Sequence, residues 1–376
     1  MIISRRNFVK GSFAGILSVG LSSQNLTRAF SPIESKIGNP TANEKYAPYK
    51  DWIFIDALGG IMPNEKGIAD IKRSGVTMIE TTLGAPGDPP FSYEQSVRDC
   101  AMWHGIFDAH EDLLIRVKTT EDILEAKKTG KLALMIGFQN GTHLDRDIDN
   151  VKFFYDLGIR QIQLTYNSLN YLGAGCTERR DVGLSDFGVQ VVVKMNELGM
   201  LVDLSHCGVK TTLDGIEASA KPVLFTHTNC EALCNNPRGK SDEEIKKLAA
   251  NGGVMGITTV NFFVSKKPKS TLDDYIAHIE YVADLVGIDH VGIGTDSSIS
   301  GWRSMFPTEK TFLDYHAQYK FKPEVDLRWP PFIEELDVPE KMYIMADRLA
   351  QRGFSAIDIQ KVMGGNFMRV YKEVLG

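Results

Sequence analysis

The chain has 376 residues, 43% of them hydrophobic and 24% charged, which is the composition of a soluble globular protein with one large domain or two medium ones. Its formal net charge of −6 is mild and no lysine or arginine run interrupts it, which argues against a nucleic-acid partner. The cysteines are odd in number and not closely paired, so they predict neither a zinc knuckle nor a dense disulfide framework, and at least one thiol is unpaired within the chain (Cys100, Cys176, Cys207, Cys230 and Cys234).

The first 30 residues have the features of a twin-arginine export signal. Arg5 and Arg6 precede a weakly apolar stretch over residues 11–21, and residues 27–29 (Thr-Arg-Ala) form a plausible cleavage site. The apolar stretch is shorter than the about 20 residues needed to cross a bilayer. We therefore expect residues 1–30 to be a signal peptide that the twin-arginine export machinery reads, and the protein to be periplasmic. The alternative is a fortuitous arginine pair before a short anchor helix.

A leader over residues 31–50, rich in Pro, Ser, Asn and Lys, precedes a single predicted domain over residues 51–376. Short apolar runs predict eight strands, over residues 52–57, 76–81, 132–137, 161–165, 201–206, 223–227, 254–257 and 290–293. Periodic patterns and capping residues predict helices over residues 65–73, 92–110, 120–129, 147–157, 186–198, 209–218, 241–250, 271–286, 339–352 and 356–375. Eight strands with intervening helices indicate a (β/α)8 TIM-type barrel with extra C-terminal helices.

A doubly wound open sheet is the alternative fold. Such sheets usually carry a G-x-G-x-x-G phosphate loop after the first strand. Here the first strand ends in Asp56-Ala-Leu-Gly-Gly60, which lacks that spacing. The barrel is therefore the predicted fold.

Two of the apolar runs end in a histidine: Leu201-Val-Asp-Leu-Ser-His206 and Val223-Leu-Phe-Thr-His227. In a barrel of this kind, the carboxyl ends of the strands form the rim where chemistry is carried out. Neutral imidazole is a good zinc ligand, so His206 and His227 on neighbouring strand ends could share one metal ion. The alternative is that each is a hydrogen-bonded structural residue.

Two further polar residues are expected on the same rim. Asp296 follows the last strand, after Gly292 and Gly294, where it could complete a ligand set or act as general base or acid. Arg238 lies in the loop after the His227 run, and a guanidinium there suits a substrate carboxylate. The alternatives are an N-cap or loop-fixing role for Asp296 and a surface ion pair for Arg238.

Several blocks, taken together, resemble the membrane (renal-type) dipeptidases of the amidohydrolase superfamily. They are Gly183-Leu-Ser-Asp-Phe-Gly188, Leu201–His206, Phe225-Thr-His227, His290-Val-Gly-Ile-Gly-Thr-Asp296 and Gly364-Gly-Asn-Phe-Met-Arg-Val370. The resemblance covers nearly the whole mature chain. It implies a metal-dependent barrel, often dimeric, that cleaves dipeptides and tolerates a D-residue at the C-terminal position. It also implies metal-ligand roles for His206 and His227, an acid/base role for Asp296 and a substrate-carboxylate role for Arg238.

The chain departs from that family at three parts of the site. Leu58 and Gly60 stand where a His-x-Asp pair binds the first of two zinc ions. Gln139 stands where a glutamate bridges the two metals, and Tyr166 where a histidine contacts the tetrahedral intermediate. Leucine and glycine have no donor atoms and a neutral amide is a poor bridge between cations, so the first metal site is predicted to be absent.

The second site is predicted to survive with one metal ion, zinc or another divalent ion. Its expected ligands are His206, His227, Gln139 and Asp296. One metal can still activate water near neutral pH. Tyr166 is expected to contact the substrate and to donate a hydrogen bond to an oxyanion, as a catalytic group beside Asp296.

Other residues near these motifs have open interpretations. His143 could act as a substitute metal ligand. Cys207 and Cys230 follow the two histidines closely, so a Cys-His metal or nucleophile site is conceivable. Trp302 and Phe306 could line the pocket or pack the loop after the last strand.

Two functions of different class follow from these observations. The first is an exported metal-dependent hydrolase of dipeptide-like amide substrates. The second is a barrel that has lost hydrolysis and binds a peptide-like ligand or assists the maturation of an exported natural product. The retained His206, His227, Asp296 and Arg238 favour the first, and Leu58, Gly60 and Gln139 favour the second.

Overall fold

The computed structural model describes residues 44–61, 64–84, 92–318 and 325–376. The predicted signal peptide and residues 31–43 of the predicted leader lie outside these residues. Within the described part of the chain, no helix combines the length and the apolar character needed to span a membrane.

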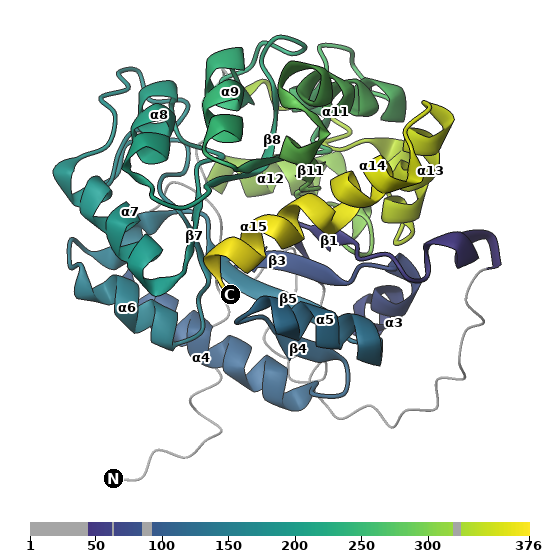
Figure 1. Ribbon diagram of the computed structural model, residues 1–376, viewed down its shortest axis with the longest axis horizontal. Helices are drawn as coiled ribbons and strands as arrows, with labels where there is room; N and C mark the ends of the chain where they lie inside the picture. Colours follow the sequence, from purple (N-terminus) through teal and green to yellow (C-terminus); the bar gives the residue numbers. More distant parts are fainter. Residues whose placement is uncertain (1–43, 62–63, 85–91, 319–324) are drawn as a thin grey trace.

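Eight parallel strands form a barrel, which confirms the predicted fold (Figure 1). Their order is β1 (Ile55–Asp56), β3 (Met78–Thr82), β5 (Leu132–Phe138), β6 (Gln161–Gln163), β7 (Leu201–Asp203), β8 (Leu224–Cys230), β10 (Val254–Ile257) and β11 (Val291–Ile293). Backbone bonds from Ala57 N to Ile293 O (3.0 Å) and from Asp296 N to Leu58 O (2.8 Å) join the first and last strands. These eight strands lie at the eight apolar runs of the sequence.

The α-helices surround and close the barrel. They are α3 (Glu65–Ser74), α4 (Tyr93–Ala109), α5 (Thr120–Thr129), α6 (Asp149–Asp156), α7 (Asp186–Leu198), α8 (Val209–Ala218), α9 (Asp242–Ala250), α10 (Asn261–Val264), α11 (Leu272–Val286), α12 (Glu309–Gln318), α13 (Lys341–Gln351), α14 (Ala356–Gln360) and α15 (Asn366–Val374). Ser241 and Glu244 form the expected capping box at the start of α9.

The last predicted helix is interrupted. A π-helical segment, Lys361–Gly365, separates α14 from α15. A Cβ at Gly364 would lie 2.3 Å from Ile53 O, so the chain can pass the start of β1 only with glycine there. Helix α15 then crosses the amino ends of the strands (Figure 1), where Phe367 and Val370 pack against their first residues.

Sequence analysis missed several elements, and two of them show why. Strand β4 (Leu114–Arg116) is too short to show a period and exists because it pairs with β5. Helix α12 lies in the long segment after β11, the last barrel strand. No further barrel strand follows α12 in the described part of the chain, so the strand–helix alternation of the sequence does not indicate it. Both depend on tertiary partners more than on local pattern.

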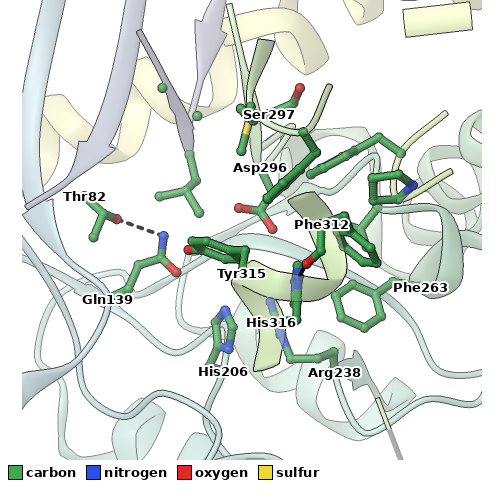
Figure 2. Close-up of a pocket in the computed structure, with 18 of the residues that line it drawn as sticks. Thr82, Gln139, His206, Arg238, Phe263, Asp296, Ser297, Phe312, Tyr315 and His316 are labelled. Atoms are coloured by element: carbon green, nitrogen blue, oxygen red, sulfur yellow. Dashed lines mark hydrogen bonds between the residues drawn. The ribbon is translucent and has the colours of Figure 1, made fainter. Parts of the chain in front are cut away.

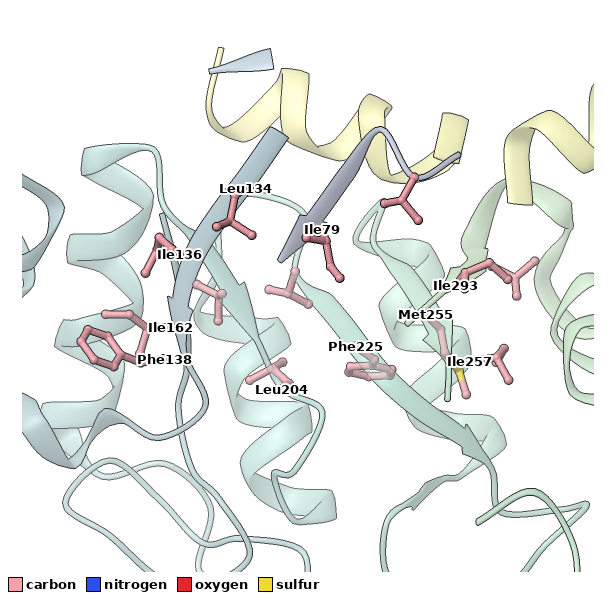
Figure 3. Close-up of a cluster of buried hydrophobic side chains, with 14 of the residues drawn as sticks. Ile79, Leu134, Ile136, Phe138, Ile162, Leu204, Phe225, Met255, Ile257 and Ile293 are labelled. Carbon is pink, nitrogen blue, oxygen red and sulfur yellow. The ribbon is translucent and has the colours of Figure 1, made fainter. Parts of the chain in front are cut away.

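The core has two layers because strand side chains alternate between barrel interior and exterior. Figure 3 shows outward-facing side chains such as Ile79, Leu134 and Ile257 between the strands and the surrounding helices. Inward-facing Met78 and Met135 belong to the cluster that α15 covers. The amino end of the barrel is thereby filled, which leaves the opposite rim for a site.

A buried glutamate lies inside the barrel. Glu80 on β3 stands over Gly137, where a Cβ would meet Glu80 Oε1 at 2.2 Å. Neither carboxylate oxygen has a hydrogen-bond partner among the described residues. Burial, followed by the charges of Asp203, Asp56 and Asp296, raises the pKa of Glu80 well above its ordinary value. The folded chain therefore favours the neutral form of this carboxyl more than the unfolded chain does.

The Glu80→Gln variant should be more stable than the parent protein at pH 8, with a smaller difference at pH 5. The pKa of Glu80 is higher in the folded than in the unfolded chain, so its contribution is fully present below the unfolded pKa and is lost as pH rises towards the folded pKa. Each pKa unit corresponds to about 1.4 kcal/mol. Thermal unfolding at both pH values tests this, with the exposed Glu94→Gln as control. If the two variants change the unfolding temperature equally at both pH values, the prediction is contradicted.

Candidate functional site

The predicted site residues gather at the carboxyl rim of the barrel (Figure 2). Gln139 follows β5, Tyr166 follows β6 and His206 follows β7, while Asp296 follows β11. All of them, together with Arg238, line one cavity of about 150 Å³. His227 lies in β8 beneath this surface and is fully buried.

The two histidines are in direct contact, with their Nε2 atoms 2.8 Å apart. His206 Nδ1 lies 2.8 Å from Asn167 Oδ1, an acceptor, so this nitrogen carries its hydrogen. His227 Nδ1 lies 2.8 Å from Thr226 Oγ1. The Thr226 hydroxyl donates its single hydrogen to Asp203 Oδ2 (2.7 Å), so it accepts one from His227. Both Nε2 atoms therefore present a lone pair to each other.

Two lone pairs at this distance repel each other unless both interact with a cation. Burial, followed by the charge of Arg238, lowers the pKa of His206 and of His227 well below the ordinary value, which disfavours a proton there. Metal-binding histidines typically donate Nδ1–H to an oxygen, as both do here. The pair thus fits a divalent metal ion as two of its ligands.

The remaining predicted ligands are near but do not complete a cluster. Among the described residues, no group of three or more His, Cys, Asp or Glu side chains could hold a metal ion. Gln139 donates from Nε2 to Thr82 Oγ1 at 2.8 Å, which fixes its amide at the pocket wall (Figure 2). The ligand roles of Gln139 and Asp296 stay predictions.

Asp296 has the environment of a proton-transfer group. The backbone of Asp296 is in the left-handed region (φ 57°). Two residues earlier, a Cβ at Gly294 would lie 1.8 Å from Thr226 O. This close approach is the reason for glycine in the motif. Burial raises the pKa of Asp296 to about 7, with Arg238 opposing and Asp56 adding to the shift. A carboxyl with this pKa can both accept and return a proton near neutral pH.

Arg238 is anchored to the backbone of the two histidine segments and is not a surface ion pair. It is almost fully buried and donates from Nη1 to Ser205 O (2.5 Å) and from Nη2 to His227 O (2.7 Å). These bonds use two of its five N–H groups. The guanidinium also lines the cavity, so donors remain for a ligand carboxylate.

Tyr166 stacks on His206, with ring centroids 4.1 Å apart and an interplanar angle of 21°. Leu58 and Gly60 also line the cavity and contribute no donor side chain. Gly60 lies in the short strand β2 (Gly59–Gly60), which pairs with β12 (Ser297–Ser298). The rim of the first strand is therefore an apolar wall.

The structure shows which of the remaining candidate residues could take part in the site. His143 is fully buried, stacks on Phe138 at 3.7 Å and lies outside the cavity lining. Burial raises the pKa of Cys207 to about 11 and also raises that of Cys230, so neither is poised as a thiolate. No disulfide joins the five cysteines, all of which are described. Phe306 lines the cavity, whereas Trp302 does not.

Sequence analysis missed several residues of the site. Asn167 and Thr226 orient the histidines, and only their positions beside Tyr166 and His227 could have indicated this. The larger omission is α12, whose Phe312, Tyr315 and His316 line the cavity. Their i, i+3, i+4 spacing was the available signal.

Comparison with known proteins gives a consistent result. The family pattern described as Membrane dipeptidase (Peptidase family M19) matches residues 87–305. Dipeptidase tcpJ of Claviceps purpurea is 26% identical over 324 residues, which cover 82% of this chain and 69% of that protein. Dipeptidase verJ of Clonostachys rogersoniana is 34% identical over 200 residues, but these span only half of each protein (51% and 50%).

Among solved structures, an amidohydrolase from Pseudomonas aeruginosa superposes with a TM-score of 0.78 and 33% sequence identity, over 87% of this chain and 98% of that one. A dipeptidase of family M19 shares the fold at 16% identity, with a TM-score of 0.71 over 87% of this chain and 99% of that one. With the family pattern over more than half of the chain, this protein belongs to the membrane dipeptidase family, peptidase family M19.

Proposed function

We propose that this chain is a metal-dependent hydrolase of dipeptide-like amides that works with one metal ion, held by His206 and His227. The observation that carries the proposal is the pair of Nε2 lone pairs that face each other at 2.8 Å with both Nδ1 hydrogens already donated. Zinc suits two neutral imidazoles, and other divalent ions are alternatives.

The surrounding residues have complementary roles in this proposal. Arg238 holds the substrate carboxylate with its remaining N–H groups, which fixes the amide over the histidines. Tyr166 donates to the developing oxyanion, and Asp296 takes a proton from water and returns it to the leaving amine. When bound, a divalent ion there would polarise the carbonyl and acidify water.

The metal content should be no more than one ion per chain, because Leu58 and Gly60 supply no ligands for a second. Elemental analysis of protein purified without chelator, then reconstituted with zinc, manganese or iron, measures this. Hydrolysis of a dipeptide panel should appear with metal and disappear with chelator. Absence of both metal and turnover after reconstitution would contradict the proposal, and two tightly held ions would contradict the single-metal form.

We also propose export to the periplasm by the twin-arginine route, supported by Arg5 and Arg6 in the N-terminal pattern. The Arg5→Lys/Arg6→Lys double variant should remain in the cytoplasm, whereas the parent should appear in the periplasmic fraction of the same cells. If the parent and the double variant divide between cytoplasm and periplasm in the same proportion, export by this route is contradicted. The homodimer implied by the family remains an expectation that sedimentation of the purified protein would test.

A second function is favoured by one specific observation. The first-strand rim is apolar, and no third His, Cys, Asp or Glu side chain joins the histidine pair in the described residues. These features suit a barrel that binds a peptide-like ligand, or assists maturation of an exported natural product, without cleaving it. A His206→Ala variant that retains full biological activity would favour this function over hydrolysis.

A further inference from the structure

The outer wall of the cavity is formed by an aromatic cluster that is separate from the barrel core. It comes from α10, from the segment after β12, from α12 and from the strand-like segment near residue 332. Its cavity-lining members are Phe262, Phe263, Phe306, Phe312, Tyr315 and Phe332. The wall is therefore assembled from segments that lie outside the barrel strands.

The rings of this wall are mutually packed. Phe306 contacts Phe312 edge to face at 5.4 Å and Tyr315 at 5.3 Å. Phe312 and Tyr315 come from the same face of α12, and Figure 2 shows them on the cavity side of that helix. His316, beside them, is neutral because burial lowers its pKa to about 4. Such a wall is preformed and carries no charge on these side chains.

The aromatic wall meets the charged part of the site at Arg238. The guanidinium carbon of Arg238 lies 5.5 Å from the centre of the Phe263 ring. A carboxylate held by Arg238 would place the side chain on the same α-carbon beside Phe263 and Phe312. One cavity of about 150 Å³ is thus lined by both the guanidinium and the aromatic rings. Leu58 also lines the cavity, and its side chain carries no polar group.

We propose that this wall selects substrates whose C-terminal residue is aromatic. The ring would pack edge to face or offset against Phe263 and Phe312, the favoured geometries for aromatic pairs. A short side chain such as that of alanine would leave the wall uncovered. This inference rests on the proposed function, since it uses the amide and carboxylate positions assigned there.

Hydrolysis of matched dipeptides tests the preference. The metal-reconstituted protein should cleave Gly-Phe with a kcat/KM roughly ten-fold or more above that for Gly-Ala, a factor within the range of apolar pocket discrimination. The Phe312→Ala variant should lose most of this ratio, because the ring that packs against the aromatic side chain is removed. Leu313→Ala is the matched control, because Leu313 lies on α12 but is 49% exposed and lies outside the cavity lining. If Phe312→Ala folds poorly, Phe312→Leu replaces it.

A binding measurement separates this inference from the proposed function. Phosphinate dipeptide mimics that differ only in a phenylalanyl or alanyl C-terminal side chain are titrated calorimetrically, whether or not dipeptides are cleaved. Tighter binding of the phenylalanyl mimic that Phe312→Ala abolishes supports the aromatic wall even if turnover is absent. Equal affinities, a preference unchanged in Phe312→Ala, or no binding of either mimic would overturn it. Cleavage of Gly-Phe and Gly-Ala at equal rates would overturn it while leaving the hydrolase function intact.

Discussion

Replacing His206 with alanine is expected to remove metal retention and to lower dipeptide hydrolysis at least ~10³-fold, the scale of losing a group that acts on the reacting centre. His206 supplies one of the two facing Nε2 atoms, 2.8 Å from His227, so a single imidazole would remain. Elemental analysis and kcat/KM measured on the same sample test both parts. A metal site that survives with one histidine would contradict the proposed pair.

The His206→Ala result needs a control for folding. The substitution also removes the hydrogen bond between His206 and Asn167, and such a bond contributes about 0.5–1.5 kcal/mol, so thermal unfolding is measured alongside. His290→Ala is a matched control, because His290 bonds Gly253 O at 2.9 Å before β11 and lies outside the cavity lining. Full activity in His290→Ala with none in His206→Ala assigns the loss to the site. Biological activity that persists in His206→Ala without hydrolysis would favour the ligand-binding function.

Replacing Arg238 with alanine should have the second largest effect, a roughly 10²-fold or greater loss of kcat/KM that appears mainly in KM. A charge-assisted hydrogen bond contributes about 1.5–3 kcal/mol, and Arg238 would make more than one to a carboxylate. The same substitution removes the donors of Ser205 O and His227 O, so a lower unfolding temperature is also expected. Stability alone therefore cannot identify the role.

The preference for a free carboxylate isolates the role of Arg238. The parent protein should cleave a dipeptide faster than its C-terminal amide, and Arg238→Ala should cleave both equally slowly. Arg238→Lys keeps the charge but cannot keep the planar pair of bonds, so it should retain part of the preference. If the dipeptide-to-amide ratio is unchanged in Arg238→Ala, this guanidinium does not bind the carboxylate.

The barrel was predictable because its signals are local and repeated. Each apolar run that predicted a strand lies on one of the eight barrel strands, and glycine or capping residues mark most helix ends. The ends of short strands were less certain: the run over 52–57 contains only the two-residue strand Ile55–Asp56. Pairing with neighbours, not the run itself, decides where a ladder stops.

The site, like the fold, could be predicted from the sequence only in part. His206, Asp296 and Arg238 were recognisable from their places after strands, and the structure brings them to one cavity. His227 was expected at the end of its strand but lies within β8, fully buried and outside the cavity lining. The protonation and orientation of the histidines were not recognisable, because these depend on Asn167, Thr226 and Asp203, three residues brought together by separate strands and loops.

The sequence by itself determined the barrel, the two histidines on neighbouring strands and the absence of donor side chains at Leu58 and Gly60, because each is a property of residue type at a position along the chain. Only the tertiary structure decided that the two Nε2 atoms face each other and that Arg238 bonds the backbone carbonyl of His227. It also decided that α12 lays Phe312 over the cavity. The physical reason is that burial, pKa and cavity shape arise from contacts between segments distant in the chain, which no local pattern records.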